Sequence, residues 1–187
     1  MKNPIAERIT DFLKHYPPFS SLSYLNLLEI AKTCQVIYLE KNQTLFKIND
    51  ATHSFFYVVA SGAVGLSVTS DADDVLIDKC DEGDILGLRP FFAKNNYLMT
   101  AKAREESIVY AIPIETFKPY VAANPDVLSF LLESFASNTR NPYDKNHKGK
   151  LISENVIYND QSSEIQYYQP IKYTSNPITA SPNDVVK

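Results

Sequence analysis

Two glycines four residues apart mark the stretch of this sequence whose residue types point to chemistry. Gly83 and Gly87 bracket a turn that leads into Arg89-Pro90, a pattern that predicts the start of a short helix. Backbone N–H groups at such a turn can hold an anion, because they lack partners there and the local dipole is positive. The same spacing also suits two ordinary turns that need a positive φ, so both interpretations stay open.

Other residues that could do chemistry are scattered. His15, His53 and His147 lie in three unrelated segments, whereas a metal-dependent cupin-type enzyme needs several ligands that converge. That enzyme is kept as an alternative function, but we expect no catalytic residue and no metal site in this chain. Cys34 and Cys80 are far apart and have no Cys or His at metal spacing, which predicts buried thiols.

Short β-branched and aromatic runs separated by turn-rich segments surround the glycine turn. They predict strands at Val36–Leu39, Thr44–Ile48, Phe55–Val59, Val64–Val68, Val75–Lys79, Thr100–Arg104 and Ser107–Ile112. Regularly spaced short strands are typical of a small antiparallel barrel or roll. The interruption between Gly83 and Thr100 is too long for a hairpin turn, and loops of this length are often functional.

Helices are predicted on both sides of the strands. One begins at Asn3-Pro4 and stops before Pro17-Pro18, and another follows from about Leu22 to Cys34. Two more are expected at Ile114–Ala122 and Pro125–Ser137. The last has an apolar stripe that either docks on the roll or pairs with a second copy: Leu128, Leu131, Leu132 and Phe135. The expected fold is mainly β, an antiparallel β-roll of the double-stranded β-helix or jelly-roll type, with N-terminal and C-terminal helices.

These elements predict five regions. They are N-terminal helices at 1–35, a β-roll at 36–112 with its special loop at 83–100, C-terminal helices at 113–139, a polar linker at 140–172, and a final segment at 173–187. Ser181-Pro182 with Asp184 resembles a capped helix start, yet three residues follow it. We therefore expect the chain to be a fragment whose next domain has been removed.

Composition limits the partners. The 187 residues carry 18 Lys+Arg and 22 Asp+Glu, a formal net charge of −4 that disfavours a phosphate-neutralising surface. Residues 141–187 offer no pattern for a helix-turn-helix, so we expect no nucleic-acid partner. No apolar run approaches the ~20 residues of a membrane span or forms a signal peptide, which predicts no membrane partner and a cytoplasmic location.

Several short sequence motifs together resemble the cyclic-nucleotide-binding domain family over about residues 10 to 138. They are Phe12-Leu13 with Pro17-Pro18-Phe19, Thr44–Ile48, Phe56–Val64, Gly83–Gly87, Thr100–Ala103 and Ile112-Pro113. In that family a β-roll presents a phosphate-binding cassette, and helices at either end move when the ligand arrives. The resemblance implies a regulatory domain of a larger signal-transduction protein, not an enzyme, that senses a small ligand or a partner. No cofactor is assigned, and the ligand class left open is a nucleotide or another small anion.

The resemblance places the ligand-binding candidates in the cassette: Gly87, Leu88, Arg89, Pro90, Tyr97, Leu98 and Thr100. Leu88 replaces the family's ribose-binding glutamate, and Tyr97 replaces its phosphate-binding arginine. Losing both interactions lowers affinity by roughly a hundredfold to ten-thousandfold, so we expect no cyclic AMP binding of the usual kind. Tyr97 either donates a hydrogen bond to a ligand or fills the pocket, and Arg89 either enters the pocket or stays solvated. A purely structural or protein-interaction roll with a filled pocket is the other alternative.

The C-terminal residues Tyr173–Val186 resemble the opening of a CBS domain. Gly87–Phe91 with Asn96–Leu98 is similar to bacterial signalling proteins that join a cyclic-nucleotide-binding-like domain to a CBS pair and a nucleotidyltransferase region. This resemblance implies that the parent protein carries a nucleotidyltransferase domain and that the partners of this chain are downstream domains of the same polypeptide. A homodimer through the C-terminal helix is the other partner expected.

Overall fold

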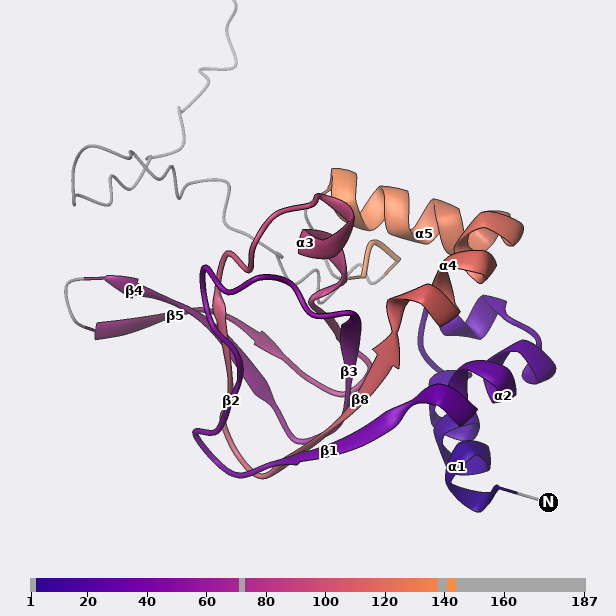
Figure 1. Ribbon diagram of the computed structural model, residues 1–187, viewed down its shortest axis with the longest axis horizontal. Coiled ribbons are helices and arrows are strands. Elements are labelled where there is room, and N and C mark those ends of the chain that lie inside the picture. The colour runs from indigo at the N-terminus through magenta and orange to yellow at the C-terminus, as the bar shows by residue number, and fades with distance from the viewer. Residues whose placement is uncertain (1–2, 71–72, 138–140, 144–187) are drawn as a thin grey trace, which may run out of the picture. The chain divides into compact units, whose positions relative to one another are not determined.

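The computed structural model describes residues 3–70, 73–137 and 141–143. All of them lie in the first of two compact units, residues 1–153, and the second unit comprises residues 154–187. The predicted linker apart from residues 141–143, and the predicted CBS-like segment at 173–187, therefore lie outside the described residues. Figure 1 shows how the described elements follow one another.

The N-terminal helices form largely where the sequence predicts them. In α1 (Pro4–Leu13), the Asn3 side chain accepts a hydrogen bond from the Ala6 N–H at 3.2 Å, and proline occupies the first turn. The second helix, α2 (Tyr24–Thr33), begins two residues later than predicted, because Ser23 is its N-cap. A short 3₁₀ helix, η1 (Phe19–Ser21), lies between them and was not predicted.

Two four-stranded antiparallel sheets make the predicted β-roll. One has the order β1-β8-β3-β6 and the other β2-β7-β4-β5. The strands are β1 (Gln35–Leu39), β2 (Thr44–Phe46), β3 (Phe55–Ser61), β4 (Val64–Ser70), β5 (Asp73–Cys80), β6 (Ile85–Leu86), β7 (Thr100–Ala103) and β8 (Ser107–Pro113). β2 ends before the predicted Ile48, whose N–H donates to the side-chain hydroxyl of Thr100 instead of to a backbone carbonyl of β7. The chain then turns at Asn49, which has a φ of 69°.

The interruption between Gly83 and Thr100 holds β6 and a short helix, α3 (Leu88–Phe92). The helix begins one residue before the predicted Arg89, because Gly87 is its N-cap in the left-handed conformation. β6 pairs with β3, with Leu86 opposite Tyr57. The roll thus fixes the start of this segment, which then leads through α3 to β7.

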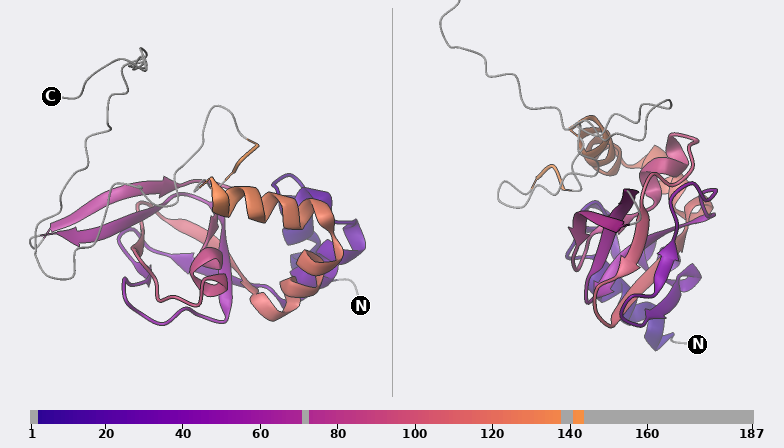
Figure 2. Two further views of the ribbon diagram at one scale, coloured as in Figure 1. Left: turned by 90° about the horizontal axis from the view of Figure 1, so that it is seen from above. Right: turned by 90° about the vertical axis from the view of Figure 1, so that its left-hand side faces the viewer.

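Two C-terminal helices follow, α4 (Ile114–Ala123) and α5 (Pro125–Ala136). The Asn124 side chain accepts hydrogen bonds from the first N–H groups of α5. α5 lies across the top of the roll beside α3 (Figure 1, Figure 2). Its predicted apolar stripe divides, since Leu131 is buried and Phe135 half-buried whereas Leu128 and Leu132 are exposed.

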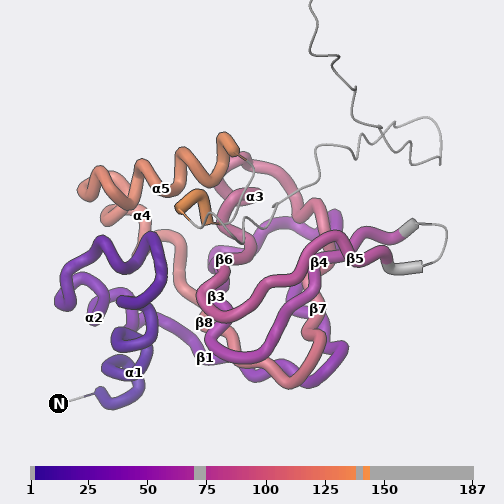
Figure 3. Tube along the Cα trace, turned by 180° about the vertical axis from the view of Figure 1, so that it is seen from behind, coloured from indigo at the N-terminus to yellow at the C-terminus, as the bar shows by residue number. Residues whose placement is uncertain are grey.

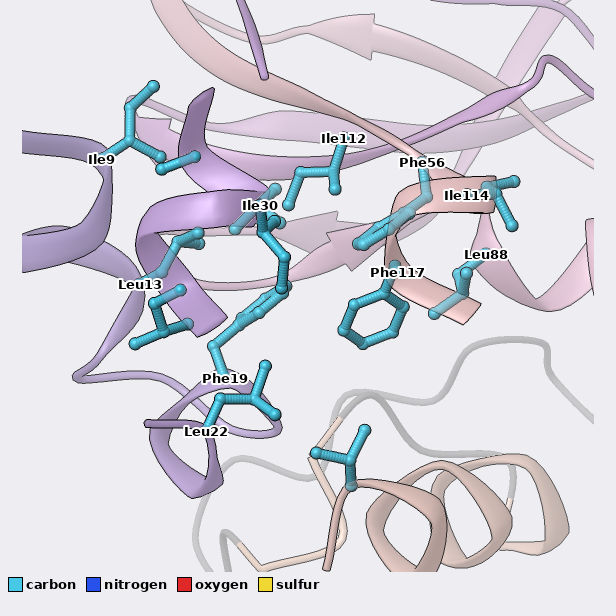
Figure 4. Close-up of a cluster of buried hydrophobic side chains, with 14 of the residues drawn as sticks. Ile9, Leu13, Phe19, Leu22, Ile30, Phe56, Leu88, Ile112, Ile114 and Phe117 are labelled. Carbon is cyan, nitrogen blue, oxygen red and sulfur yellow. The ribbon is translucent and has the colours of Figure 1, made fainter. Parts of the chain in front are cut away.

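The buried side chains form two clusters. The first joins the terminal helices to β3 and β8, and Figure 4 shows Phe19, Phe56 and Phe117 meeting within it. The ring centroids of Phe56 and Phe117 are 5.1 Å apart. The second cluster fills the inside of the roll and includes Val59, Val109 and Tyr97. Figure 3, seen from behind, shows α1, α2 and α4 gathered at one end of the roll, where the first cluster lies.

Candidate functional site

A pocket of about 270 Å³ lies where the cassette segment, the roll and α5 meet. The segment from Ile85 to Met99 supplies most of its wall, and Phe46 and Leu66 of the roll also line it. The C-terminal helix α5 covers it with Phe130, Leu131, Ser134 and Phe135, and the wall is mostly apolar. A pocket of this composition suits a small ligand that is itself largely apolar.

Positions 83 and 87 both require glycine, but for different reasons. Gly87 has a φ of 78°, and a Cβ there would make an ordinary contact with the Tyr97 ring at 3.5 Å. Gly83 has a φ of 87°, and a Cβ there would overlap the ring of Tyr16. Gly87 is thus required by backbone conformation alone, whereas Gly83 also lets the segment after α1 approach the start of the cassette.

Arg89 connects the cassette to the C-terminal helix. Its side chain is half-buried, and Nη2 donates a hydrogen bond to the backbone carbonyl of Phe135 in the last turn of α5, at 3.1 Å. Burial lowers the pKa of the guanidinium, which nonetheless keeps its charge in proteins. A cation is well placed there, because carbonyls at a helix C-terminus carry partial negative charge. The interpretation of Arg89 as a solvated side chain is therefore wrong.

Tyr97 fills the inside of the roll. It is 1% exposed, and its ring stacks on Phe46 with centroids 3.9 Å apart and planes 12° from parallel. Its hydroxyl accepts a hydrogen bond from the backbone N–H of His53 at 3.0 Å. Burial, the largest cause, raises the pKa of Tyr97. Of the two roles considered for this residue, the geometry fits the filling ring.

Two residues that lie next to Tyr97, outside the pocket wall, were not singled out from the sequence. His53 Nδ1 and the Tyr57 hydroxyl lie 2.5 Å apart, and the His53 ring meets the Tyr97 ring edge-on. Burial, with a smaller contribution from Tyr97, raises the pKa of Tyr57 to about 12. Alternation along β3 could have indicated Tyr57, because it shares a strand face with the buried Val59. In the sequence His53 was considered only as a metal ligand, a role that its isolation from the other histidines disfavoured.

The other predicted residues lie as follows. Leu88 is 2% exposed and belongs to both the pocket wall and the first core cluster. Pro90 and Leu98 also line the pocket, but Thr100 does not, since its hydroxyl accepts the Ile48 N–H beside β2. Six of the seven candidates are thus brought together at one pocket. Phe92, at the end of α3, is 38% exposed.

Metal ligands do not gather in the part of the chain that the structure describes. No group of three or more His, Cys, Asp or Glu side chains is placed there to hold an ion. His15 is exposed, and His53 faces the tyrosines of the roll. Cys34 and Cys80 are both free, with Cys80 buried and Cys34 half-buried. Among the described helices, none has the length and apolar character needed to cross a membrane.

Comparison with known sequences agrees with this geometry. Residues 36–124 match the family model described as cyclic nucleotide-binding domain. The neuropathy target esterase sws of Drosophila willistoni is 31% identical over 112 residues, which cover 54% of this chain and 7% of that protein. The same esterase of Drosophila melanogaster is 30% identical over 112 residues, which cover 54% of this chain and 8% of the esterase. The chain thus spans less than a tenth of these curated relatives.

Solved structures resemble the fold more widely. The sensor domain of the transcriptional regulator DNR from Pseudomonas aeruginosa has a TM-score of 0.59 at 20% identity, covering 68% of this chain and 91% of that chain. The regulatory subunit of a cAMP-independent protein kinase A from Trypanosoma brucei has a TM-score of 0.62 at 16% identity, covering 70% and 47%. A putative cyclic nucleotide binding protein from Ruegeria pomeroyi has a TM-score of 0.57 at 18% identity, covering 70% and 58%. The chain has the β-roll fold of these domains.

Proposed function

From this cyclic nucleotide-binding fold, we propose that the chain is a regulatory sensor domain that does not bind cyclic AMP in the usual way. One observation carries the proposal. Tyr97 lies at the position where the resembling family has its phosphate-binding arginine. Its ring stacks on Phe46, and its hydroxyl accepts a hydrogen bond from the His53 backbone N–H. It supplies no cation for a phosphate, and Leu88 supplies no carboxylate for a ribose.

A structural neighbour supports the idea that this fold can be regulatory without the usual ligand. The regulatory subunit from Trypanosoma brucei is described as belonging to a cAMP-independent kinase, whereas a triple variant of it is described with cAMP bound in its A site. The same fold therefore serves a cAMP-independent regulatory subunit and, in the triple variant, binds cAMP. The same reasoning supports a retained fold with exchanged ligand chemistry in this chain.

We also propose what kind of larger protein contains this domain. The matching segment is a small part of the Drosophila esterases, as expected for a module that regulates larger proteins. From the resemblance of Tyr173–Val186 to a CBS domain, we propose downstream CBS and nucleotidyltransferase domains as its partners in a cytoplasmic protein. The coding sequence that adjoins these codons tests the domain order directly.

Isothermal titration of the 187-residue chain with cyclic AMP and cyclic GMP tests the proposal. We expect dissociation constants weaker than about 0.1 mM for both, because the charge-assisted phosphate pair and the ribose contact are missing. Low-micromolar binding of either nucleotide would overturn the proposal.

A reciprocal variant tests the alignment of the cassette. Leu88→Glu combined with Tyr97→Arg should strengthen cyclic AMP binding at least about tenfold, because it restores both kinds of polar contact. Circular dichroism checks that the variant is folded. Leu98→Arg is the matched control, since it adds the same charge at an exposed pocket residue and should give no such gain. A folded double variant without improved binding contradicts the alignment.

The homodimer through the C-terminal helix is proposed from the outer face of α5. Leu128 and Leu132 are four residues apart on one helix face and are 41% and 59% exposed. Such a face can meet its own copy across a two-fold axis. We expect a dimer by sedimentation velocity, and Leu132→Glu should shift it to monomer. Leu25→Glu, at an exposed leucine of α2, should leave the dimer intact. A monomeric wild type at all concentrations tested contradicts the proposal.

A further inference from the structure

The pocket beside α5 combines an apolar wall with one cation. Among the described residues that line it, Arg89 carries the charged side chain, and no carboxylate is present. Asn95 and Ser134 add polar groups, while Leu66, Leu86 and Phe130 are typical of the rest. A cationic ligand would find no partner in this wall. An apolar molecule that carries an anionic group would find both a surface to bury and a charge to pair with.

The size of the pocket limits the ligand further. Its volume of about 270 Å³ lies just below the range of roughly 300 to 1,000 Å³ that is usual for pockets of drug-sized molecules. Tyr97 and Phe46, whose rings stack inside the roll, line part of its wall. The ligand is therefore compact, with its apolar part against these rings and its acid group toward Arg89.

The hydrogen bond from Arg89 to α5 gives such a ligand a way to be sensed. One acceptor of its guanidinium is a neutral carbonyl, that of Phe135, and the same residue also lines the pocket. A carboxylate adds an ion pair to the guanidinium hydrogen bond and can accept it through both oxygens, which a neutral carbonyl cannot do. A carboxylate that reaches Arg89 would therefore compete with the last turn of α5 for the same donor.

We propose that the pocket binds a compact apolar carboxylic acid whose carboxylate takes the guanidinium of Arg89 from the Phe135 carbonyl. Binding then loosens the last turn of α5, because its carbonyl loses a charged donor. This inference rests on the proposed regulatory function and assigns to it a ligand class and an output element. The acid replaces a cyclic nucleotide as the anion that the β-roll detects.

Isothermal titration of the 187-residue chain with three matched probes tests the ligand class. Decanoate should bind at least about tenfold more tightly than decanol, which lacks the charge, and decylamine should bind more weakly still. Arg89→Gln should remove the preference for decanoate over decanol. Arg8→Gln, at an exposed arginine of α1, is the matched control and should leave that preference unchanged.

A second variant tests whether the ligand occupies the pocket, and hydrogen exchange tests whether binding loosens α5. Met99→Trp fills the pocket wall from a half-buried position and should weaken decanoate binding at least about tenfold, with folding checked by circular dichroism. Decanoate should also speed amide hydrogen exchange in the last turn of α5. Arg89→Gln should have that effect on exchange without any ligand.

Three results would overturn the inference: equal binding of decanol and decanoate, undiminished decanoate binding by folded Met99→Trp, or no decanoate binding at about 1 mM. If decanoate and both cyclic nucleotides fail to bind, the ligand class is wrong and the proposed function stands. Tight binding of a cyclic nucleotide overturns the proposed function itself.

Discussion

Replacing Tyr97 with Ala is expected to lower the free energy of unfolding by about 3 to 5 kcal/mol, the usual cost of removing a large buried aromatic side chain. The ring is 1% exposed and stacks on Phe46 inside the roll. Its removal leaves a cavity between two sheets and takes the acceptor from the His53 N–H. Urea denaturation of the wild type and the variant measures the difference.

Tyr97→Phe is the matched control for this prediction. It keeps the ring and its stacking and removes only the hydroxyl that accepts the His53 N–H. The expected cost is about 1 kcal/mol, the typical net value of one hydrogen bond. A loss below about 1 kcal/mol for Tyr97→Ala would show that the ring does not fill a packed interior. Equal losses for the two variants would assign the whole effect to the hydroxyl.

The second large effect is expected at the start of the cassette. Gly83→Ala should lower the free energy of unfolding by about 3 kcal/mol or more, because strain of about 1 to 3 kcal/mol adds to overpacking of similar size. The backbone there has a φ of 87°, and the added Cβ would overlap the ring of Tyr16. Tyr16 is itself held by Phe12, with ring centroids 4.8 Å apart, so it cannot move without disturbing α1.

Two comparisons separate the causes of that loss. Gly87→Ala has the same backbone problem at a φ of 78° but only ordinary contacts, so it should cost about 1 to 2 kcal/mol. Tyr16→Ala removes the overlapping ring, so adding Gly83→Ala to it should cost less than in the wild type. Thermal unfolding of the four variants provides the values. If Gly83→Ala and Gly87→Ala cost the same, the close approach of Tyr16 contributes nothing.

Much of the roll could be predicted because its strands are local patterns. Runs such as Phe55–Val59 and Ser107–Ile112 alternate or concentrate apolar residues between turn residues, and the structure has β3 and β8 there. The start of α1 could be predicted because Asn3 caps it. β6, of two residues, and η1, of three, are too short to leave a period in the sequence.

The candidate site was only partly visible in the sequence. A resemblance located the cassette and implied that the end helices respond to a ligand, but it named no residue of α5, whose Ser134 and Phe135 reach the pocket only through tertiary packing. The partner of Arg89 is a backbone carbonyl 46 residues further along the chain. Every residue has a carbonyl, so no residue type in the sequence marks this one as an acceptor. The hydroxyl contact between Tyr97 and the His53 backbone is hidden for the same reason.

The first core cluster bears on how this domain can be inherited and recombined. The segment that matches the family model, residues 36–124, contributes Phe56 and Phe117 to that cluster. Phe19 and Ile30 come from before the segment, and Phe130 comes from after it. A gene rearrangement that transferred only the matching segment would remove part of the packing around the two phenylalanines. The roll and both sets of helices therefore form one folding unit, and we expect gene rearrangements to transfer them together.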